Sequence, residues 1–205
     1  MFIEEAKWIH ETLKMIDNNG AKSVANFGSS SLDFRKKVQP HIHEEIFAPL
    51  EKRGWKVTHI DMKEDDGIDI IADITDAGFY NKHRQQYSLV ICTNMLEHVN
   101  DISLVVKNLI AACEKSGHIL ITVPYKYKKH LDPIDNMFRP KPEEIAALFN
   151  GKDIRVIKSG IISIHRKEYY RIKKSSFPLW GYRERVMYHL GKRHKVSGIL
   201  IKING

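Results

Sequence analysis

Polar residues suited to holding a nucleotide follow three apolar stretches of the chain. The segments that contain these polar residues are Asn26-Phe27-Gly28-Ser29, Asp61-Met62 and Thr93-Asn94. A glycine at such a position lets a ligand approach the backbone closely. A carboxylate such as Asp61 can accept hydrogen bonds from both hydroxyls of a ribose, because two vicinal donors match its two oxygens. Together these residues predict a site for a nucleoside-containing cofactor.

Each of these residues also has a purely structural interpretation. Gly28 is compatible with a simple turn, Asp61 with a solvated strand end, and Asn94 with a helix cap. Their shared position, directly after three predicted strands, favours a common site. In a doubly wound sheet, the carboxyl ends of the first, second and fourth strands converge on one crevice.

The stretch Tyr87–Val99 is expected to form the centre of that sheet. It begins with the apolar run Leu89–Cys92 and turns polar at Thr93-Asn94. A short continuous run with β-branched residues is typical of a strand that is buried on both faces. Further strands are predicted at residues 23–27, 55–60, 68–72 and 118–123. Helical periodicity predicts helices at residues 3–18, 41–53, 101–115 and 142–149.

The alternation of these elements predicts an α/β fold with a mostly parallel sheet and helices on its faces. Residues 31–39 look polar and irregular, and the connection between the second and third strands is short for a helical crossover. Residues 154–164 and 196–203 are two more candidate strands. Because no clear crossover helix separates them, we expect them to form a terminal antiparallel pair.

Composition is that of an ordinary globular protein. The chain has 205 residues, of which 42% are hydrophobic and 28% charged, which suits one domain over residues 1–205. No stretch is long and apolar enough to span a bilayer, and the acidic N-terminus does not resemble a signal peptide. Cys92 and Cys113 lack metal-ligand spacing. We therefore expect a reduced, cytoplasmic protein.

The net charge of +8 is concentrated in a basic segment, residues 166–195, which holds ten Lys and Arg residues against two Glu residues. Aromatic residues are interleaved with these charges: Tyr169, Tyr170, Phe177, Trp180, Tyr182 and Tyr188. We expect this segment to be an insertion between the last two strands. Three interpretations stay open: RNA binding through phosphates and bases, contact with an anionic membrane surface, and a lid with a solvated face.

Several motifs resemble the class I S-adenosylmethionine-dependent methyltransferases. Tyr87–Val99, ending in Leu-Glu-His-Val, resembles their fourth strand and the helix that follows it, and Ser116–Pro124 resembles their fifth strand. His130–Pro133 and Phe138–Glu143 resemble small bacterial members, some of which modify glycans. The resemblance covers about residues 20–150. It implies a Rossmann-like, doubly wound seven-strand sheet, mostly parallel with an antiparallel terminal strand, and S-adenosylmethionine as the cofactor.

The resemblance also assigns roles to residues. It places Asn26, Phe27, Gly28 and Ser29 near the methionine part of the cofactor. It places Asp61 at the ribose and Met62 beside the adenine, with Asp73 and Ile74 at the adenine edge. Thr93 and Asn94 would line the pocket under the sulfonium. The first loop departs from the family pattern Asp/Glu-x-Gly-x-Gly-x-Gly, since it has one glycine and no acid. A non-catalytic cofactor- or partner-binding module is therefore an alternative to an enzyme.

The resemblance implies methyl transfer, and the expected acceptor is a hydroxyl of a sugar, a glycan or a related small metabolite. An RNA methyltransferase that uses the basic segment is the alternative. A general base assists transfer to a hydroxyl, and the candidates are His98 in the Leu-Glu-His-Val motif and His130 in the loop after the fifth strand. His41 and His43 would face different sides of a helix, so no metal site is predicted.

Overall fold

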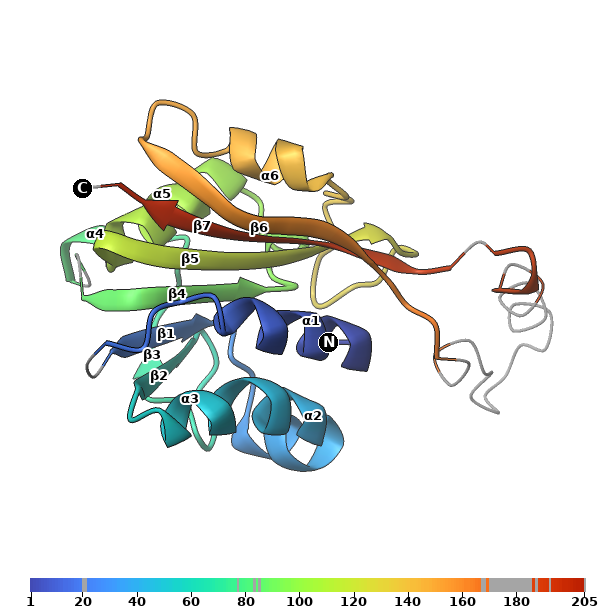
Figure 1. Ribbon diagram of the computed structural model, residues 1–205, viewed down its shortest axis with the longest axis horizontal. Coiled ribbons are helices and arrows are strands. Elements are labelled where there is room, and N and C mark those ends of the chain that lie inside the picture. The colour runs from blue at the N-terminus through green and yellow to red at the C-terminus, as the bar shows by residue number, and fades with distance from the viewer. Residues whose placement is uncertain are drawn as a thin grey trace.

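The computed structural model describes residues 1–19, 22–76, 78–82, 84, 86–166, 169, 186, 188–191 and 193–204. Seven strands form one sheet in the order β3-β2-β1-β4-β5-β7-β6 (Figure 1). The strands are β1 (Ser23–Phe27), β2 (Lys56–Asp61), β3 (Ile70–Ile71), β4 (Tyr87–Thr93), β5 (Cys113–Lys126), β6 (Ile154–Ser163) and β7 (Lys195–Ile203). Strands β1 to β5 are parallel to one another, whereas β7 runs antiparallel to both β5 and β6. The predicted fold class is confirmed.

Helices cover both faces of this sheet (Figure 1). On one face, Ile9 of α1 and Leu50 of α3 pack in the same apolar cluster as Leu120 of β5. On the other face, Leu109 of α5 and Ile145 of α6 pack against the sheet. The helices are α1 (Ile3–Leu13), α2 (Pro40–Ile42), α3 (Ala48–Lys52), α4 (Phe79–Lys82), α5 (Ile102–Ala112) and α6 (Pro142–Ala147). Shorter helical turns are η1 (Phe34–Val38), η2 (His43–Phe47) and η3 (Leu96–His98).

Strand β4 lies at the centre of the core, as its apolar run predicts. Leu89 and Ile91 belong to the cluster under α1 and α3. Val90 and Cys92 belong to the cluster under α5 and α6. Successive side chains of a strand point to opposite faces, so the run is apolar because both faces of β4 are covered. Its polar end is thereby fixed at the carboxyl edge of the sheet.

Several local expectations differ from the structure. Residues 113–115, expected to end a helix, begin β5. Residues 34–38, expected to be irregular, form the helical turn η1. The first helix ends at Leu13, earlier than its periodicity predicts. Strand β3 is only Ile70–Ile71, yet it pairs in parallel with β2 despite the short connection. The expected pairing of the last two strands is confirmed, because β6 and β7 are antiparallel neighbours.

Most of the basic segment, residues 166–195, lies outside the described residues, so its predicted role as an insertion stays a prediction. The same holds for the expectation that residues 1–205 form one domain.

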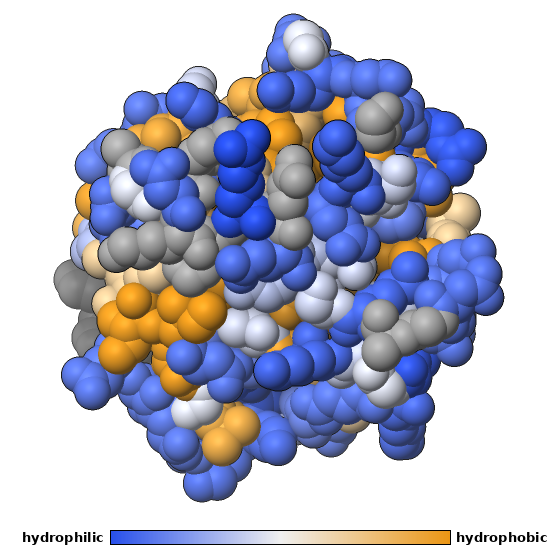
Figure 2. Space-filling view, turned by 90° about the vertical axis from the view of Figure 1, so that its left-hand side faces the viewer, coloured by the Kyte–Doolittle hydropathy of each residue, from blue (hydrophilic) through white to orange (hydrophobic). Residues whose placement is uncertain are grey.

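The end of the molecule that carries the amino ends of the parallel strands has a mainly hydrophilic surface with smaller apolar patches (Figure 2). Among the described residues, no helix has both the length and the apolar character needed to cross a bilayer.

Candidate active site

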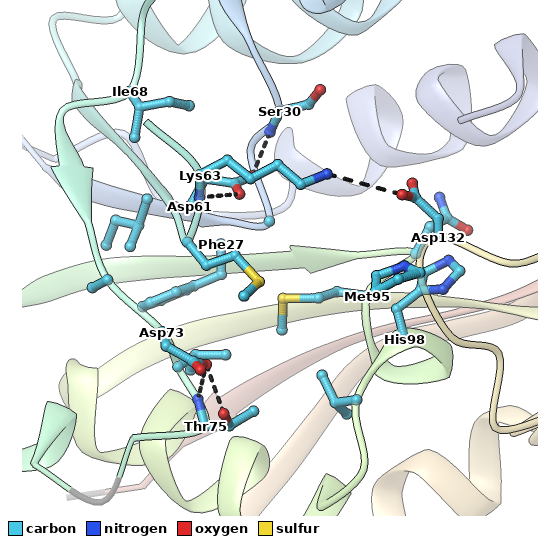
Figure 3. Close-up of a pocket in the computed structure, with 18 of the residues that line it drawn as sticks. Phe27, Ser30, Asp61, Lys63, Ile68, Asp73, Thr75, Met95, His98 and Asp132 are labelled. Atoms are coloured by element: carbon cyan, nitrogen blue, oxygen red, sulfur yellow. Dashed lines mark hydrogen bonds and ion pairs between the residues drawn. The ribbon is translucent and has the colours of Figure 1, made fainter. Parts of the chain in front are cut away.

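A cavity of about 510 Å³ opens at the carboxyl ends of β1, β2 and β4. Its wall includes the predicted residues Phe27, Gly28, Asp61, Met62, Asp73, Ile74 and Asn94. Asp61 and Asp73 lie toward one end of the cavity and His98 toward the other, with Met95 between them (Figure 3). The convergence expected from three polar strand ends is therefore present, and it produces one elongated pocket.

Asp61 joins the loops that follow β1 and β2. Its Oδ2 accepts a hydrogen bond from the Ser30 backbone N–H at 2.9 Å, and its Oδ1 accepts one from the Lys63 N–H at 3.2 Å (Figure 3). Each carboxylate oxygen has a second lone pair. Asp61 therefore keeps acceptor capacity for a pair of ligand hydroxyls while its orientation is fixed by the backbone.

Gly28 lets the first loop pass close to Met95. Its φ of +66° lies in the left-handed region, where a side chain is strained. A Cβ at this position would lie 3.1 Å from Met95 Sδ. The Gly28 N–H donates to the Ile60 carbonyl at 3.0 Å, which attaches the loop to β2. A glycine is thus required both by the conformation and by the close contact.

Arg35 holds the first loop from behind, a role that sequence patterns did not reveal. The residue is 3% exposed. Its guanidinium donates to the carbonyls of Ser29, Ser30 and Gly67, with distances of 3.0 Å to Ser29 and 2.8 Å to Gly67. Burial lowers the pKa of Arg35. One buried cation therefore connects the loop after β1 to the loop between β2 and β3.

Asp73 and Ile74 form the far wall of the pocket. Asp73 Oδ1 accepts from the Thr75 N–H at 2.8 Å and from Thr75 Oγ1 at 2.7 Å (Figure 3). The buried Ile74 is held by Asn108 of α5, whose Nδ2 donates to the Ile74 carbonyl at 2.6 Å. The acidic and apolar surfaces of this wall suit a heterocycle that carries hydrogen-bond donors at its edge.

Three predicted cofactor residues lie outside the cavity wall, namely Asn26, Ser29 and Thr93, and so does the candidate base His130. The buried Asn26 has its Nδ2 3.1 Å from His59 Nδ1, and burial lowers the pKa of His59 to about 4. The neutral imidazole therefore accepts a hydrogen bond from the amide. Ser29 is also buried, and Thr93 pairs with Thr122 inside the sheet. These three side chains lie behind the cavity wall and support the residues that form it.

Asn94 turns the chain at the end of β4. Its φ is +50°, and its backbone N–H donates to the Thr122 carbonyl at 2.8 Å. Its Nδ2 donates to Oε1 of Glu5 at 2.7 Å, and Thr122 Oγ1 donates to the same oxygen at 2.6 Å. Glu5 is fully buried. This carboxylate on α1 fixes the turn under the pocket, and nothing in the sequence near Asn94 indicates it.

The two candidate bases lie next to each other. The rings of His98 and His130 are 4.8 Å apart and perpendicular. His98 lines the cavity, and its Nδ1 lies 2.6 Å from the Ile134 carbonyl. His130 Nδ1 lies 3.2 Å from Asp135 Oδ2. Desolvation is the main cause that lowers the pKa of His130. The sequence identified both histidines but did not place them together.

The sheet order and the pocket can be compared with known proteins. Residues 19–159 match the family model described as a methyltransferase domain. No curated protein matches the chain in sequence. Among solved structures, a SAM dependent methyltransferase from Archaeoglobus fulgidus is 13% identical, with a TM-score of 0.57 over 96% of this chain and 94% of that chain.

A second solved structure is 1,6-didemethyltoxoflavin-N1-methyltransferase from Burkholderia thailandensis, with bound 1,6-didemethyltoxoflavin and S-adenosylhomocysteine. It is 12% identical, with a TM-score of 0.56 over 99% of this chain and 78% of that chain. At these identities the likeness shows the fold, whereas the family model covers well over half of the chain. The chain therefore belongs to the methyltransferase domain family, as a class I S-adenosylmethionine-dependent methyltransferase.

Proposed function

We propose that this enzyme methylates a hydroxyl group of a sugar, a glycan or a related small metabolite. The observation that carries the proposal is the two-ended pocket. Carboxylates line one end, and His98 lines the other end of the same cavity. A cofactor site and a site for a polar acceptor would thus share one space. A hydroxyl is favoured because the histidine end offers groups that can take its proton.

The pocket fits the cofactor in the chemistry of its donors. Asp61 would accept from the ribose hydroxyls, while Asp73 and the buried Ile74 would face the adenine. Asp65 and Asp132 also line the cavity and add negative charge, which favours a cationic ligand. Gly28 leaves room for close approach to the backbone. S-adenosylmethionine, when bound, supplies an activated methyl group on a sulfonium.

The residues at the histidine end would orient the acceptor and remove its proton. An acceptor hydroxyl that takes the methyl group supplied by S-adenosylmethionine would have to lose its proton. His98 and His130 are the groups placed to assist that loss. The low pKa of His130 keeps its imidazole neutral at pH 7. The pocket would hold the cofactor and the acceptor next to each other, which suits an in-line displacement.

The test is a transfer assay with methyl-labelled S-adenosylmethionine and a panel of acceptors. The panel should contain sugars, nucleotide sugars and phenols, together with matched amines and carboxylic acids. We expect label on hydroxyl-bearing members, and slower transfer by the His130→Ala variant. Labelling of amines or acids alone would contradict the hydroxyl assignment without contradicting cofactor use.

A hydroxyl of RNA is a second candidate acceptor, supported by the ten Lys and Arg residues of the basic segment. Replacing Lys173, Lys174, Arg183 and Arg185 by Gln should weaken RNA binding and reduce its dependence on salt, because fewer counterions are released. The same variants, titrated with anionic vesicles, test the membrane alternative. Equal binding by variant and parent protein would remove the segment from both roles.

We also propose a cytoplasmic location. Cys92 and Cys113 are buried free thiols, which suits a reducing compartment.

A further inference from the structure

Glu97 is an unusual group for the wall behind a cofactor pocket. Its side chain is 0% exposed, and neither carboxylate oxygen has a hydrogen-bond partner among the described residues. An unpaired carboxylate is costly to bury. The position therefore calls either for a proton or for a cation that the protein atoms do not supply.

His98 directs one lone pair toward this carboxylate. Its Nδ1 lies 2.6 Å from the Ile134 carbonyl, which can only accept, so the ring N–H is on Nδ1. The Nε2 atom then carries a lone pair, and it lies 3.7 Å from Glu97 Oε1. That distance is too long for a hydrogen bond. A backbone carbonyl that fixes the tautomer in this way is the usual support of a metal-binding histidine.

His130 is supported in the same manner, by a carboxylate. Its Nδ1 lies 3.2 Å from Asp135 Oδ2. Asp135 is itself held by Arg139 Nη2 at 2.6 Å and by the Met137 N–H at 2.8 Å, and this ion pair orients its carboxylate as an acceptor for the ring. The imidazole therefore donates from Nδ1 and keeps a lone pair on Nε2. A carboxylate behind a histidine is a second common support for a metal ligand.

We propose that Glu97, His98 and His130 bind a divalent first-row transition-metal cation. Their ligand atoms all lie within 4.8 Å of one another. Metal bonds of about 2.0–2.2 Å place neighbouring tetrahedral ligands roughly 3.3 Å apart, so small side-chain rotations would close the site. Two imidazoles and one carboxylate form a donor set that suits Zn²⁺, Mn²⁺, Fe²⁺ or Co²⁺ better than Mg²⁺ or Ca²⁺.

The position of the metal site indicates what a bound cation would do for the acceptor. His98 and Ile134 line the cavity, so the open coordination positions face the acceptor end. A cation there would hold acceptor oxygens and lower the pKa of a hydroxyl. Two open positions would select acceptors with adjacent oxygens, such as the vicinal hydroxyls of a sugar. With the cation bound, the two imidazoles would be ligands, and the cation would take over from a free imidazole the role of promoting loss of the hydroxyl proton. This use rests on the proposed hydroxyl acceptor, whereas the site itself does not.

The test is Co²⁺ binding by the full chain after chelator treatment, followed by calorimetry and visible absorption. We expect one bound ion, displacement by Zn²⁺, and much weaker binding of Mg²⁺. Glu97→Gln and His130→Ala should each weaken Co²⁺ binding at least tenfold, and Asp135→Asn about 10- to 100-fold through loss of support for His130. The control is His10→Asn, because His10 also lies beside a glutamate, Glu45, but away from the pocket.

Binding of S-adenosylmethionine shows whether each variant is folded, since Glu97 and His130 are not at the cofactor end. Co²⁺ binding that is absent, or unchanged by both Glu97→Gln and His130→Ala in folded variants, would overturn the site. If an ion binds but its removal by a chelator leaves the rate of methyl transfer unchanged, the proposed role of the ion in the reaction is wrong. A bound ion without transfer to any acceptor would contradict the proposed function and leave the site standing.

Discussion

Gly28 shows how a single residue shapes the cofactor end of the pocket. Ala at this position would adopt φ near +66° and meet Met95 Sδ at 3.1 Å. The left-handed conformation alone costs about 1–2 kcal/mol. We expect Gly28→Ala to lower the free energy of unfolding by more than that, and to weaken S-adenosylmethionine binding because the first loop shifts.

Gly54 provides a matched control for this prediction. Its φ is +75°, but a Cβ there would meet nothing within 4 Å. Gly54→Ala should therefore show the backbone strain alone and keep cofactor affinity. Chemical denaturation and calorimetry measure both quantities. Equal losses in the two variants would show that the Met95 contact is unimportant.

His59 links the support of the first loop to pH. Its pKa is lowered to about 4, mainly by burial, whereas the unfolded value is about 6.5. Between these values the unfolded state binds more protons, so stability is complete above pH 6.5 and falls as the pH drops toward 4. The loss from one such histidine is at most about 1.4 kcal/mol per pH unit.

We expect His59→Gln to reduce this acid sensitivity, because a neutral amide can still accept from Asn26. Unfolding free energies measured from pH 7 to pH 4 test the prediction. His189→Gln, at an exposed position, is the control and should retain the slope of the parent protein. An unchanged slope in His59→Gln would assign the acid sensitivity to other groups.

At the scale of elements, Arg35 strengthens the connection between the loops after β1 and β2, which Asp61 also joins. Arg35→Met would leave the carbonyls of Ser29, Ser30 and Gly67 without their donor. Each unsatisfied buried group costs about 1–3 kcal/mol. We expect clear destabilisation and weaker cofactor binding. Arg155 is exposed, so Arg155→Met should change neither the stability nor the affinity for the cofactor. Similar melting temperatures for the two variants would argue against the role of Arg35.

Some of these elements could be predicted from sequence and others could not. Strand β4 contains the continuous apolar run Leu89–Cys92, and β1 is a short strand with only Val24, Ala25 and Phe27 apolar. The polar residues at their carboxyl ends identify the pocket directly. Residues 34–38 looked irregular because Arg35 and its neighbours carry charge, yet the guanidinium is buried against two carbonyls of the preceding loop and the carbonyl of Gly67, 32 residues away. The functions of Glu5 and Glu97 depend on burial by distant segments, which local patterns do not record.

At the scale of the whole molecule, the sheet order brings the site together. The carboxyl ends of β1, β2 and β4 meet in the centre of the sheet (Figure 1). The loop after β5 adds Asp132 at the same edge (Figure 3), and it brings His130 against His98. Sequence could suggest His98 and His130 separately, but only the tertiary fold places their rings in contact. Lys63 and Asp132, 3.9 Å apart, join the two sides of the pocket.

The most direct test of the account is a calorimetric titration of the protein with S-adenosylmethionine and S-adenosylhomocysteine. We expect one molar equivalent of each to bind to the parent protein, and Asp61→Ala to abolish measurable binding, because the ribose hydroxyls lose their acceptor. The exposed Asp17→Ala should bind as the parent does. Absence of binding to the parent protein, or unchanged affinity in Asp61→Ala, would contradict the assignment of the pocket.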